Sequence, residues 1–384
     1  MYAEYRLNAR SVERRFQREV IKKGYYLTAK GCINRLIDYR KTKIIIATEK
    51  GEGTISISRK NIRKAISYFY FKRTAVREDF SFCNYTSAIF AIVYACFSGI
   101  SKLQILKNGL YRLSMKGTRF FASGLERDPF IFKTLKELGG KYVLYNYKNV
   151  IESPGCLEEL DRHNMYCLID SGAFTLFNER KKLKKAAHKQ QTLFAEESLD
   201  EMVLEGYAKF INENMENPRI LGFFPLDCVG NPEKTKNNYR KLVRLAPAAT
   251  IYPVWQCTDS VEELNRLVSE EHEMIGIGGL VPFLSKRKPF VREILAKVTT
   301  RHPNVNWHAL GVADELLMDY GIFSADSTAF LNARKYAEGR RIYLPSGERV
   351  KVPNEMDTIE IIKQNLLFLI GLEKVSEPQL SFIL

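Results

Sequence analysis

Short apolar runs that end at a polar or small residue recur along the chain from about residue 118 onward, with amphipathic segments between them. Such runs are typical of buried parallel strands that end in loops. They predict strands at Arg119–Ser123, Tyr142–Asn146, Tyr166–Asp170, Ile220–Leu226, Thr250–Trp255, Glu273–Ile277, Val305–Leu310 and Ile322–Asp326. Helices are expected at Pro129–Leu138, Leu199–Asn214, Pro232–Leu245, Val261–Glu270 and Val291–Thr299. Eight strands that alternate with helices favour an α/β fold of the (β/α)8 TIM barrel type over an open doubly wound sheet.

Local signals agree with this pattern. Asn231-Pro232 and Asp259-Ser260 are plausible helix starts, because a capping side chain or a proline favours the first helical turn. Neither a GxGxxG nor a GxxxxGK[ST] segment follows the first strand, so a Rossmann or P-loop domain has no support.

Residues 1–77 carry a different pattern and predict a separate α+β module. Its expected elements are helices over 11–24 and 29–40, a hairpin of Ile44–Ala47 with Thr54–Ile57, and a helix after the capping residue Ser58. We expect a helical connector at 78–117, the barrel at 118–340, and a C-terminal hairpin and helix at 341–384.

The net charge of +15 is concentrated in this N-terminal module. Residues 1–77 hold 20 Lys and Arg against 6 Asp and Glu, whereas the remainder holds 39 against 38. A basic module beside a nearly neutral body is typical of a protein that binds nucleic acid, although a solubilising basic arm is the alternative. Candidate phosphate contacts are Arg59, Lys60, Arg63 and Lys64, with Arg180, Lys181, Lys182, Lys184 and Lys185, unless the latter group is simply a solvated loop.

The aromatic segment 68–71 could stack nucleic-acid bases or pack the basic module onto the rest of the chain. Seven scattered cysteines without a CxxC pair indicate reduced thiols and argue against disulfides or a cysteine-rich zinc site. The N-terminus has no apolar signal core, and the longest apolar run, near 88–100, is too short to span a bilayer. We therefore expect a cytoplasmic protein, in the host cytoplasm if viral, without membrane contact.

Three stretches deliver an aspartate at the end of an apolar run: YCLIDSGAF, ILGFFPLDCVG and GIFSADSTAF, with Asp170, Asp227 and Asp326. Loops at the carboxyl ends of barrel strands meet at one mouth. One such aspartate could be an ordinary helix cap. Three together are costly unless used, because neighbouring carboxylates raise each other's pKa.

The other side chains expected at the mouth are amides, small residues and one histidine: Ser171, Gln256, Gly278, Gly279, Leu280 and His308. The set has no Cys/His cluster, so it does not suit a metal. Carboxylates and amides suit the N–H and amine edge of a guanine-type base, and glycines would let main-chain groups reach the ring. Two further aspartates suit displacement at a sugar carbon, one as nucleophile and one as acid/base. His308 could instead be a packed structural histidine.

These segments resemble the tRNA-guanine transglycosylases, which exchange a guanine in nucleic acid for a 7-deazaguanine through a covalent sugar–aspartate intermediate. DSGAF at 170–174 is similar to that family's DSGGF segment, which implies that Asp170 is the general acid/base. Asp227 after FFPL and Gln256 after YPVW match the base-recognising pair. GIGGL at 276–280 and HALGV at 308–312 match further segments, and Asp326 in SADS falls at the nucleophile. The resemblance covers about residues 118–340.

The chain also departs from that family. Thr175 replaces the glutamine that commonly follows DSGGF, no cysteine occurs after Cys257 to form the zinc-binding insertion, and the first 110 or so residues have no counterpart in the tRNA enzymes. In these respects the chain resembles the DNA 7-deazaguanine transglycosylases of the DpdA type. That resemblance implies double-stranded DNA and a free 7-deazaguanine (preQ0- or preQ1-like) as substrates, without zinc or another cofactor. The alternatives are a tRNA-guanine transglycosylase, a non-catalytic nucleic-acid-binding accessory subunit, and a barrel glycosidase or decarboxylase.

Overall fold

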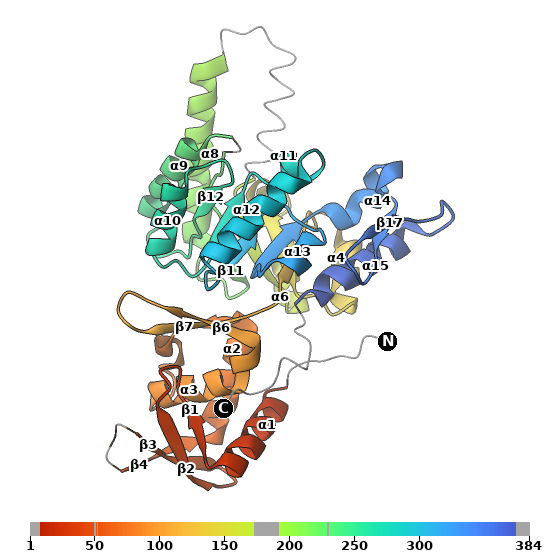
Figure 1. Ribbon diagram of the computed structural model, residues 1–384. Coiled ribbons are helices and arrows are strands. Elements are labelled where there is room, and N and C mark those ends of the chain that lie inside the picture. Colours follow the sequence, from red (N-terminus) through yellow and green to blue (C-terminus); the bar gives the residue numbers. More distant parts are fainter. Residues whose placement is uncertain (1–7, 50, 52, 173–191, 229, 374–384) are drawn as a thin grey trace. The chain divides into compact units, whose positions relative to one another are not determined.

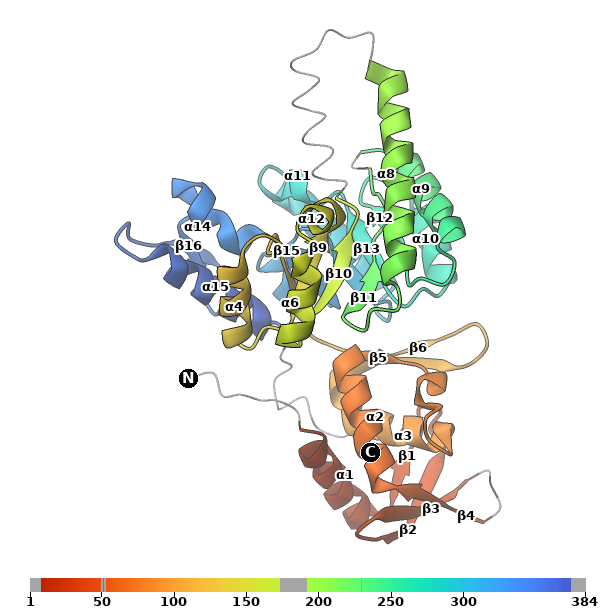
Figure 2. The ribbon, with the colours of Figure 1, turned by 180° about the vertical axis from the view of Figure 1, so that it is seen from behind.

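The protein is described by a computed structural model (Figures 1 and 2) that covers residues 8–49, 51, 53–172, 192–228 and 230–373, with only the backbone for 192–200. These residues fall into two compact units, one that ends at Lys116 and one that begins at Gly117. Each unit has a hydrophobic core of its own. No described helix is both long enough and apolar enough to cross a membrane.

The N-terminal unit packs three helices against an antiparallel sheet with the strand order β1-β2-β3-β4, and adds a small sheet with the order β5-β7-β6. Its elements are α1 (Ala9–Lys23), β1 (Tyr25–Leu27), β2 (Ile33–Tyr39), β3 (Lys43–Thr48), β4 (Thr54–Ser58), α2 (Arg59–Lys72), β5 (Thr74–Ala75), α3 (Thr86–Phe97), β6 (Ser101–Ile105) and β7 (Tyr111–Met115). The helix after Ser58 and the hairpin before it form as expected, and the Ser58 hydroxyl caps α2 by accepting from the Lys60 N–H.

The predicted helix over 29–40 is wrong, because Ile33–Tyr39 forms strand β2 between β1 and β3. Apolar residues at Ile33, Leu36 and Ile37 have the spacing of a helix face. A bulge between Leu36 and Asp38 shifts the register with β3 by one residue. Because a bulge adds one residue to a strand, it breaks the two-residue alternation and imitates a helical period.

The segment 78–117 does not form a separate helical connector. Its helix α3 lies in the core of the N-terminal unit, where Ile89, Ile92 and Val93 are fully buried. The residues after α3 form the β6–β7 hairpin instead of a helix. The boundary between the two units therefore falls at Lys116 and not at residue 77.

A buried carboxylate connects three elements of this unit. Glu13 of α1 is 1% exposed and accepts from Arg59 Nε at 2.5 Å, from Arg63 at 2.9 Å and from the Tyr39 hydroxyl at 3.2 Å. A buried charge of this kind is tolerated only when it is paired and hydrogen-bonded, so the three donors compensate for its lost hydration.

The second unit is a ring of eight parallel strands, which confirms the predicted (β/α)8 TIM barrel fold. The strands are β8 (Arg119–Ser123), β9 (Tyr142–Asn146), β10 (Tyr166–Asp170), β11 (Ile220–Phe223), β12 (Val254–Gln256), β13 (Ile275–Gly278), β14 (Trp307–Ala309) and β15 (Ser324–Ser327). The last strand pairs with the first, since β15 lies beside β8. A parallel bridge between Phe223 and Ile251 closes the ring between β11 and β12.

Helices follow the strands around the ring (Figures 1 and 2). They are α4 (Pro129–Glu137), α5 (Tyr147–Glu152), α6 (Gly155–His163), α8 (Thr192–Asn214), α9 (Pro232–Leu245), α10 (Val261–Ser269), α11 (Val281–Leu284), α12 (Lys288–Arg301) and α13 (Leu316–Asp319). After β15 come α14 (Asn332–Lys335), the hairpin β16 (Arg341–Tyr343) and β17 (Arg349–Lys351), and α15 (Thr358–Gly371). Asn231 and Ser260 cap α9 and α10 with their side chains, as the sequence predicts.

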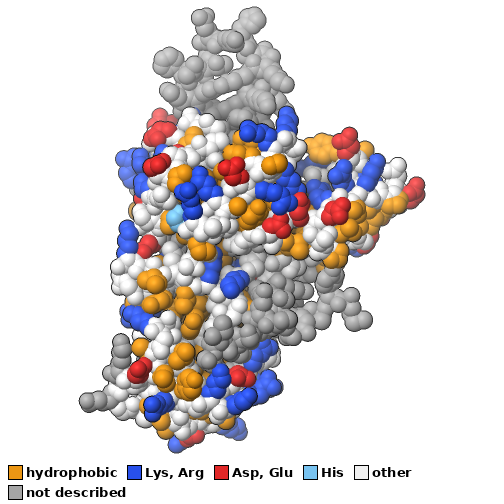
Figure 3. Space-filling model, in the orientation of Figure 1, with side chains coloured by type: hydrophobic (Ala, Val, Ile, Leu, Met, Phe, Trp, Pro, Cys, Tyr) orange, Lys and Arg blue, Asp and Glu red, His pale blue; other side chains and the backbone are white. Residues whose placement is uncertain are grey.

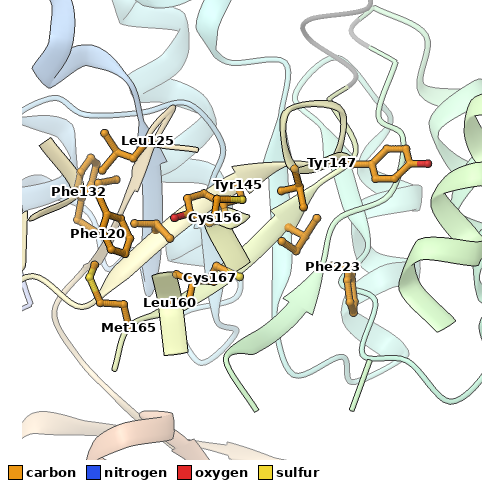
Figure 4. Close-up of a cluster of buried hydrophobic side chains, with 14 of the residues drawn as sticks. Phe120, Leu125, Phe132, Tyr145, Tyr147, Cys156, Leu160, Met165, Cys167 and Phe223 are labelled. Carbon is orange, nitrogen blue, oxygen red and sulfur yellow. The ribbon is translucent and has the colours of Figure 1, made fainter. Parts of the chain in front are cut away.

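Alternation along the strands produces two cores. One cluster packs strands against outer helices and includes Tyr145, Cys156, Leu160 and Cys167 (Figure 4). A second cluster fills the inside of the ring; its buried members are Phe121, Leu144, Leu168, Phe224, Tyr252, Val254, Met274 and Phe323. Because strand side chains alternate between faces, the residue two positions after an inward member also points inward, one layer closer to the carboxyl end.

The Glu13 network predicts a measurable stability difference. Replacing Glu13 by Gln should lower the free energy of unfolding by about 1–3 kcal/mol, because hydrogen bonds to a charged group are lost in a buried place. Chemical unfolding of the full chain measures the effect. Glu19→Gln, on the same helix with a partly exposed side chain, is the control and should change stability by less than about 0.5 kcal/mol. Equal stability of the Glu13→Gln variant and the wild type would contradict this account.

Candidate active site at the carboxyl ends of the barrel strands

The alternation of side chains along the strands, which fills the barrel interior, also places polar side chains at its mouth. Counting two residues on from the inward members of four strands gives Ser123 on β8, Asn146 on β9, Asp170 on β10 and Gln256 on β12. Phe323 precedes β15, so on this strand the count starts at Ser324, whose hydroxyl contacts Met274 inside the ring, and it gives Asp326, while Ala325 between them packs outward. The strand periodicity alone therefore selects a ring of polar side chains above an apolar interior.

Asp326 is held by three donors and is only 7% exposed. The Ser123 hydroxyl donates to Oδ2 at 2.8 Å, the Gly311 N–H donates to Oδ1 at 2.9 Å, and His308 Nε2 lies 3.3 Å from Oδ1. An ionised carboxylate offers about four lone-pair sites, two on each oxygen. Among the described residues, two of these groups contact Oδ1 and one contacts Oδ2.

His308 lies behind Asp326 in the barrel interior and does not form part of a ligand surface. Its side chain is fully buried, with its ring 4.8 Å from that of Phe224 and 5.9 Å from that of Phe121. Nδ1 lies 2.8 Å from the Ser324 hydroxyl, and Nε2 has to donate because a carboxylate only accepts. The expectation that His308 binds a base is therefore corrected: it orients Asp326.

Asp170 is a carboxyl group that holds a proton unusually tightly. Burial, with smaller contributions from the negative charges of Asp227 and Asp326, raises its pKa to about 8, against the hydrogen bond from the Gly172 N–H to its Oδ2 at 3.0 Å. The electrostatic influence of the other two aspartates means that all three predicted carboxyl groups converge. At neutral pH Asp170 is a proton donor.

Asp227 and Gln256 form a hydrogen-bonded pair in which Asp227, unlike Asp170, is mostly ionised. Burial raises the pKa of Asp227 and the 3.0 Å hydrogen bond from Gln256 Nε2 opposes this rise, so that the pKa lies at about 6. Asp227 therefore stays mostly ionised at neutral pH. Gln256 is 1% exposed, and its Oε1 accepts no hydrogen bond from any described residue. A buried acceptor without a donor is costly, which makes it a candidate for ligand contact.

Gly278, the last residue of β13, and Gly279 after it make room for this pair. A Cβ at Gly278 would lie 2.7 Å from Gln256 Nε2 and 3.1 Å from Asp227 Oδ2. A Cβ at Gly279 would lie 2.7 Å from Gln256 Oε1, and its φ of +75° also favours glycine. The two glycines thus accommodate the side chains of Asp227 and Gln256, and the contact of their main-chain groups with a base stays a prediction.

The side chains of two other predicted base-binding residues are engaged elsewhere, whereas base recognition through the main chain of the GIGGL segment, which includes Leu280, stays a prediction. The Ser171 hydroxyl donates to the Pro225 carbonyl at 3.1 Å, and its side chain is buried. Leu280 is fully buried in the core between the strands and α12. Neither side chain is presented to the mouth.

The sequence placed Gly311 at the mouth with His308, and its N–H donates to Asp326 there, whereas Ser123 was missed. Ser123 is a serine at the end of an apolar strand, which by itself predicts nothing. Its signal is positional, because it comes two residues after the inward Phe121. Glu126, in the loop after β8, was also missed. Burial raises the pKa of Glu126, and its Oε1 accepts the Asn146 N–H at 2.5 Å.

Two of the expected phosphate contacts are paired within the N-terminal unit, and phosphate binding itself stays a prediction. Arg59 and Arg63 are committed to Glu13, and Lys64 lies over the Phe82 ring at 4.1 Å, while Lys60 is exposed. Lys181, Lys182, Lys184 and Lys185, with Arg180 and Thr175, lie outside the described residues.

The aromatic segment 68–71 does not form a base-stacking platform. Phe69 is fully buried, and Tyr68 packs edge-on against Phe80 at 5.9 Å and donates to Asp79 at 2.9 Å. These side chains pack within the N-terminal unit itself. Among the described residues no group of His, Cys, Asp and Glu is arranged to hold a metal ion.

No protein-family model matches the chain, and no curated protein matches its sequence. Similar solved structures include a mutant tryptophan synthase alpha-subunit from Pyrococcus furiosus, with 12% identity and a TM-score of 0.39 over 67% of this chain and 98% of that chain. A mandelate racemase/muconate lactonizing protein from Herpetosiphon aurantiacus has 8% identity and a TM-score of 0.32 over 79% of this chain and 89% of that chain. Likeness at this level carries no argument about function, and the barrel assignment rests on the strand pairing above.

The raised pKa of Asp170 predicts that this residue destabilises the fold at high pH. An unfolded aspartate titrates near about 3.9, so between that pH and about 8 the folded state keeps a proton that the unfolded state has lost, and stability falls as pH rises. Asp170→Asn removes this penalty. Its melting temperature relative to the wild type should increase from pH 5 to pH 9, with a gain of about 1–3 kcal/mol at the upper end.

Asp161→Asn is the matched control, because Asp161 is an exposed aspartate on α6 whose partner is Arg219. Its difference from the wild type should stay constant over the same pH range. A difference for Asp170→Asn that does not depend on pH would contradict the assignment of a raised pKa.

Proposed function

We propose that this chain is a pentosyltransferase that exchanges guanine in DNA for a free 7-deazaguanine base. The observation that carries the proposal is the unequal treatment of three convergent carboxyl groups. Asp326 is held by three donors, of which one contacts Oδ2, Asp170 is protonated near neutrality, and Asp227 is ionised beside an unsatisfied Gln256 Oε1. Carboxyl groups whose pKa values are driven apart in one site are the signature of divided catalytic roles.

The proposed base binding follows from matching the donors of the base with the acceptors of the site. The Watson–Crick edge of guanine and of its 7-deaza analogues presents one ring N–H and one amine. Asp227 can accept from both, and Gln256 Oε1 can accept the second amine hydrogen. A base that lacks the amine would leave Gln256 Oε1 unsatisfied, and such a mismatch weakens binding strongly.

The chemical half uses Asp326 and Asp170. Asp326 Oδ2 attacks the anomeric carbon of the deoxyribose, and the bond from that carbon to the guanine nitrogen breaks with its electron pair on the base. Asp170 gives its proton to the leaving guanine. The incoming 7-deazaguanine then returns a proton to Asp170, its nitrogen attacks the same carbon, and the ester bond to Asp326 breaks.

The donors around Asp326 fit this role. Ser123, Gly311 and His308 hold the carboxylate in one orientation, which reduces the cost of reaching the reactive geometry. The number of glycosidic bonds is the same before and after exchange. The reaction therefore needs neither nucleotide energy nor a redox cofactor, and we propose none.

A nucleic acid is the proposed polymer because of the charge distribution, and DNA is preferred to RNA because the chain resembles the zinc-free DpdA type. Residues 1–116 hold 24 Lys and Arg against 8 Asp and Glu, whereas the barrel unit and the residues after it hold 35 against 36. The target nucleotide has to leave the base stack to reach a barrel mouth, at a cost of a few kcal/mol that polymer binding supplies.

The decisive experiment measures exchange of isotopically labelled guanine into duplex DNA by the full chain, followed by preQ0 and preQ1 with nucleoside mass spectrometry. Asp326→Ala should lower the exchange rate at least about 10³-fold, as expected for loss of a nucleophile. Asp161→Asn should leave the rate unchanged. A transfer RNA is the second acceptor: exchange on it alone would replace DNA by RNA in the proposal, and exchange on neither would refute it.

The pH dependence of exchange tests the roles separately. Asp227 has to be ionised and Asp170 protonated in the first half-reaction, so kcat/KM should be bell-shaped with limbs near pH 6 and pH 8. Asp227→Asn should lower the overall rate and remove the acidic limb, because the group that titrates there is gone. An acidic limb that persists in this variant would assign it to another residue.

A further inference from the structure

Helix α1 of the N-terminal unit carries a row of four cations on the face opposite its buried side. The row consists of Arg10, Arg14, Arg18 and Lys22, and all four side chains are exposed. The buried positions of the helix are Val12, Glu13, Phe16 and Val20. Residues four apart lie one above the other on a helix surface, so the row is continuous over about 18 Å at 1.5 Å per residue.

None of these four side chains makes an ion pair or a cation–π contact within the described part of the chain. This distinguishes the row from Arg59 and Arg63 of α2, which share the single carboxylate of Glu13. No acidic residue lies in the first turn of α1. Besides the buried Glu13, the only acidic residue of the helix is Glu19, which does not belong to the row. Like charges at four-residue spacing destabilise a helix slightly, so an unpaired row has a cost that a polyanion would offset.

We propose that this α1 row is the surface through which the protein binds double-stranded DNA. The partner follows from charge: the surrounding residues 1–116 carry the excess of positive charge noted above, and in the part of this unit that Figure 3 draws in colour Lys and Arg outnumber Asp and Glu. In taking DNA as the polymer the inference rests on the proposed function. It adds which residues hold the duplex.

The shape of the row favours a B-form duplex over other nucleic acids. The major groove of B-DNA is about 12 Å wide and admits an α-helix, so a row about 18 Å long can reach phosphates on both sides. The major groove of A-form RNA is too narrow for helix side chains. Single strands are bound by stacking on aromatic rings, and the exposed positions beside the row, Ser11 and Ile21, are not aromatic.

The test is the salt dependence of Kd for the full chain on a fluorescent duplex, measured without any free base. Each phosphate contact contributes about −0.9 to the slope of log affinity against log salt. The variant with Arg10, Arg14, Arg18 and Lys22 all changed to Gln should lose about 3 to 4 from the magnitude of the slope. Its Kd at about 0.15 M salt should rise at least ten-fold.

A matched variant removes the same charge from the sheet of the same unit: Lys30→Gln, Arg35→Gln, Lys41→Gln and Lys43→Gln. Its slope should stay within about one of the wild type. A third variant with Arg10, Arg14 and Arg18 changed to Lys keeps the charge and should restore the slope. Circular dichroism melts of all variants check that the unit remains folded.

The proposal is overturned if the row variant keeps the wild-type slope, if the sheet variant loses as much as the row variant, or if a hairpin RNA depends on the row as strongly as the duplex does. Binding and exchange are measured separately. If the wild type exchanges guanine but the row variant binds duplex as the wild type does, only this surface is refuted. If the row variant loses binding but the wild type does not exchange guanine, only the proposed function is refuted.

Discussion

Everything in the catalytic proposal depends on a single geometric constraint: side chains on a closed ring of parallel strands alternate between the outside and the inside. Inward positions below the mouth are filled by Phe121, Leu168 and Val254, and the next inward positions on the same strands are Ser123, Asp170 and Gln256. A change of one residue in register would bury the polar groups against the helices and expose the apolar ones to the mouth. The same alternation therefore builds the core and aims the polar groups of the site.

Confinement of three carboxyl groups in that mouth creates their chemical differences. Burial raises the pKa of Asp170 and of Asp227, and the protein supplies donors unequally. Asp326 receives three, Asp227 receives the Gln256 amide and Asp170 receives one main-chain N–H. The pKa of Asp170 is raised more than that of Asp227, so that an acid lies near an ionised carboxylate.

The N-terminal unit uses its charges in two distinct ways. Arg59 and Arg63 stabilise the buried Glu13 and so hold α2 against α1. The exposed cations on the other side of α1 contribute nothing to that core. Composition cannot separate these two uses, since arginines of both kinds count equally in the net charge.

Much of this protein was determined by the sequence alone. The eight strands, most of the helices, the caps at Asn231 and Ser260 and the convergence of Asp170, Asp227 and Asp326 follow from hydrophobic periodicity and from loop positions in a barrel, which are local properties. Only the tertiary structure decided that His308 supports Asp326, that the glycines at the end of β13 accommodate Gln256, and that residues 33–39 pair as a strand. The physical reason is that a side chain's partner comes from another strand or helix, and a bulge or a close approach between strands leaves no mark on the local pattern.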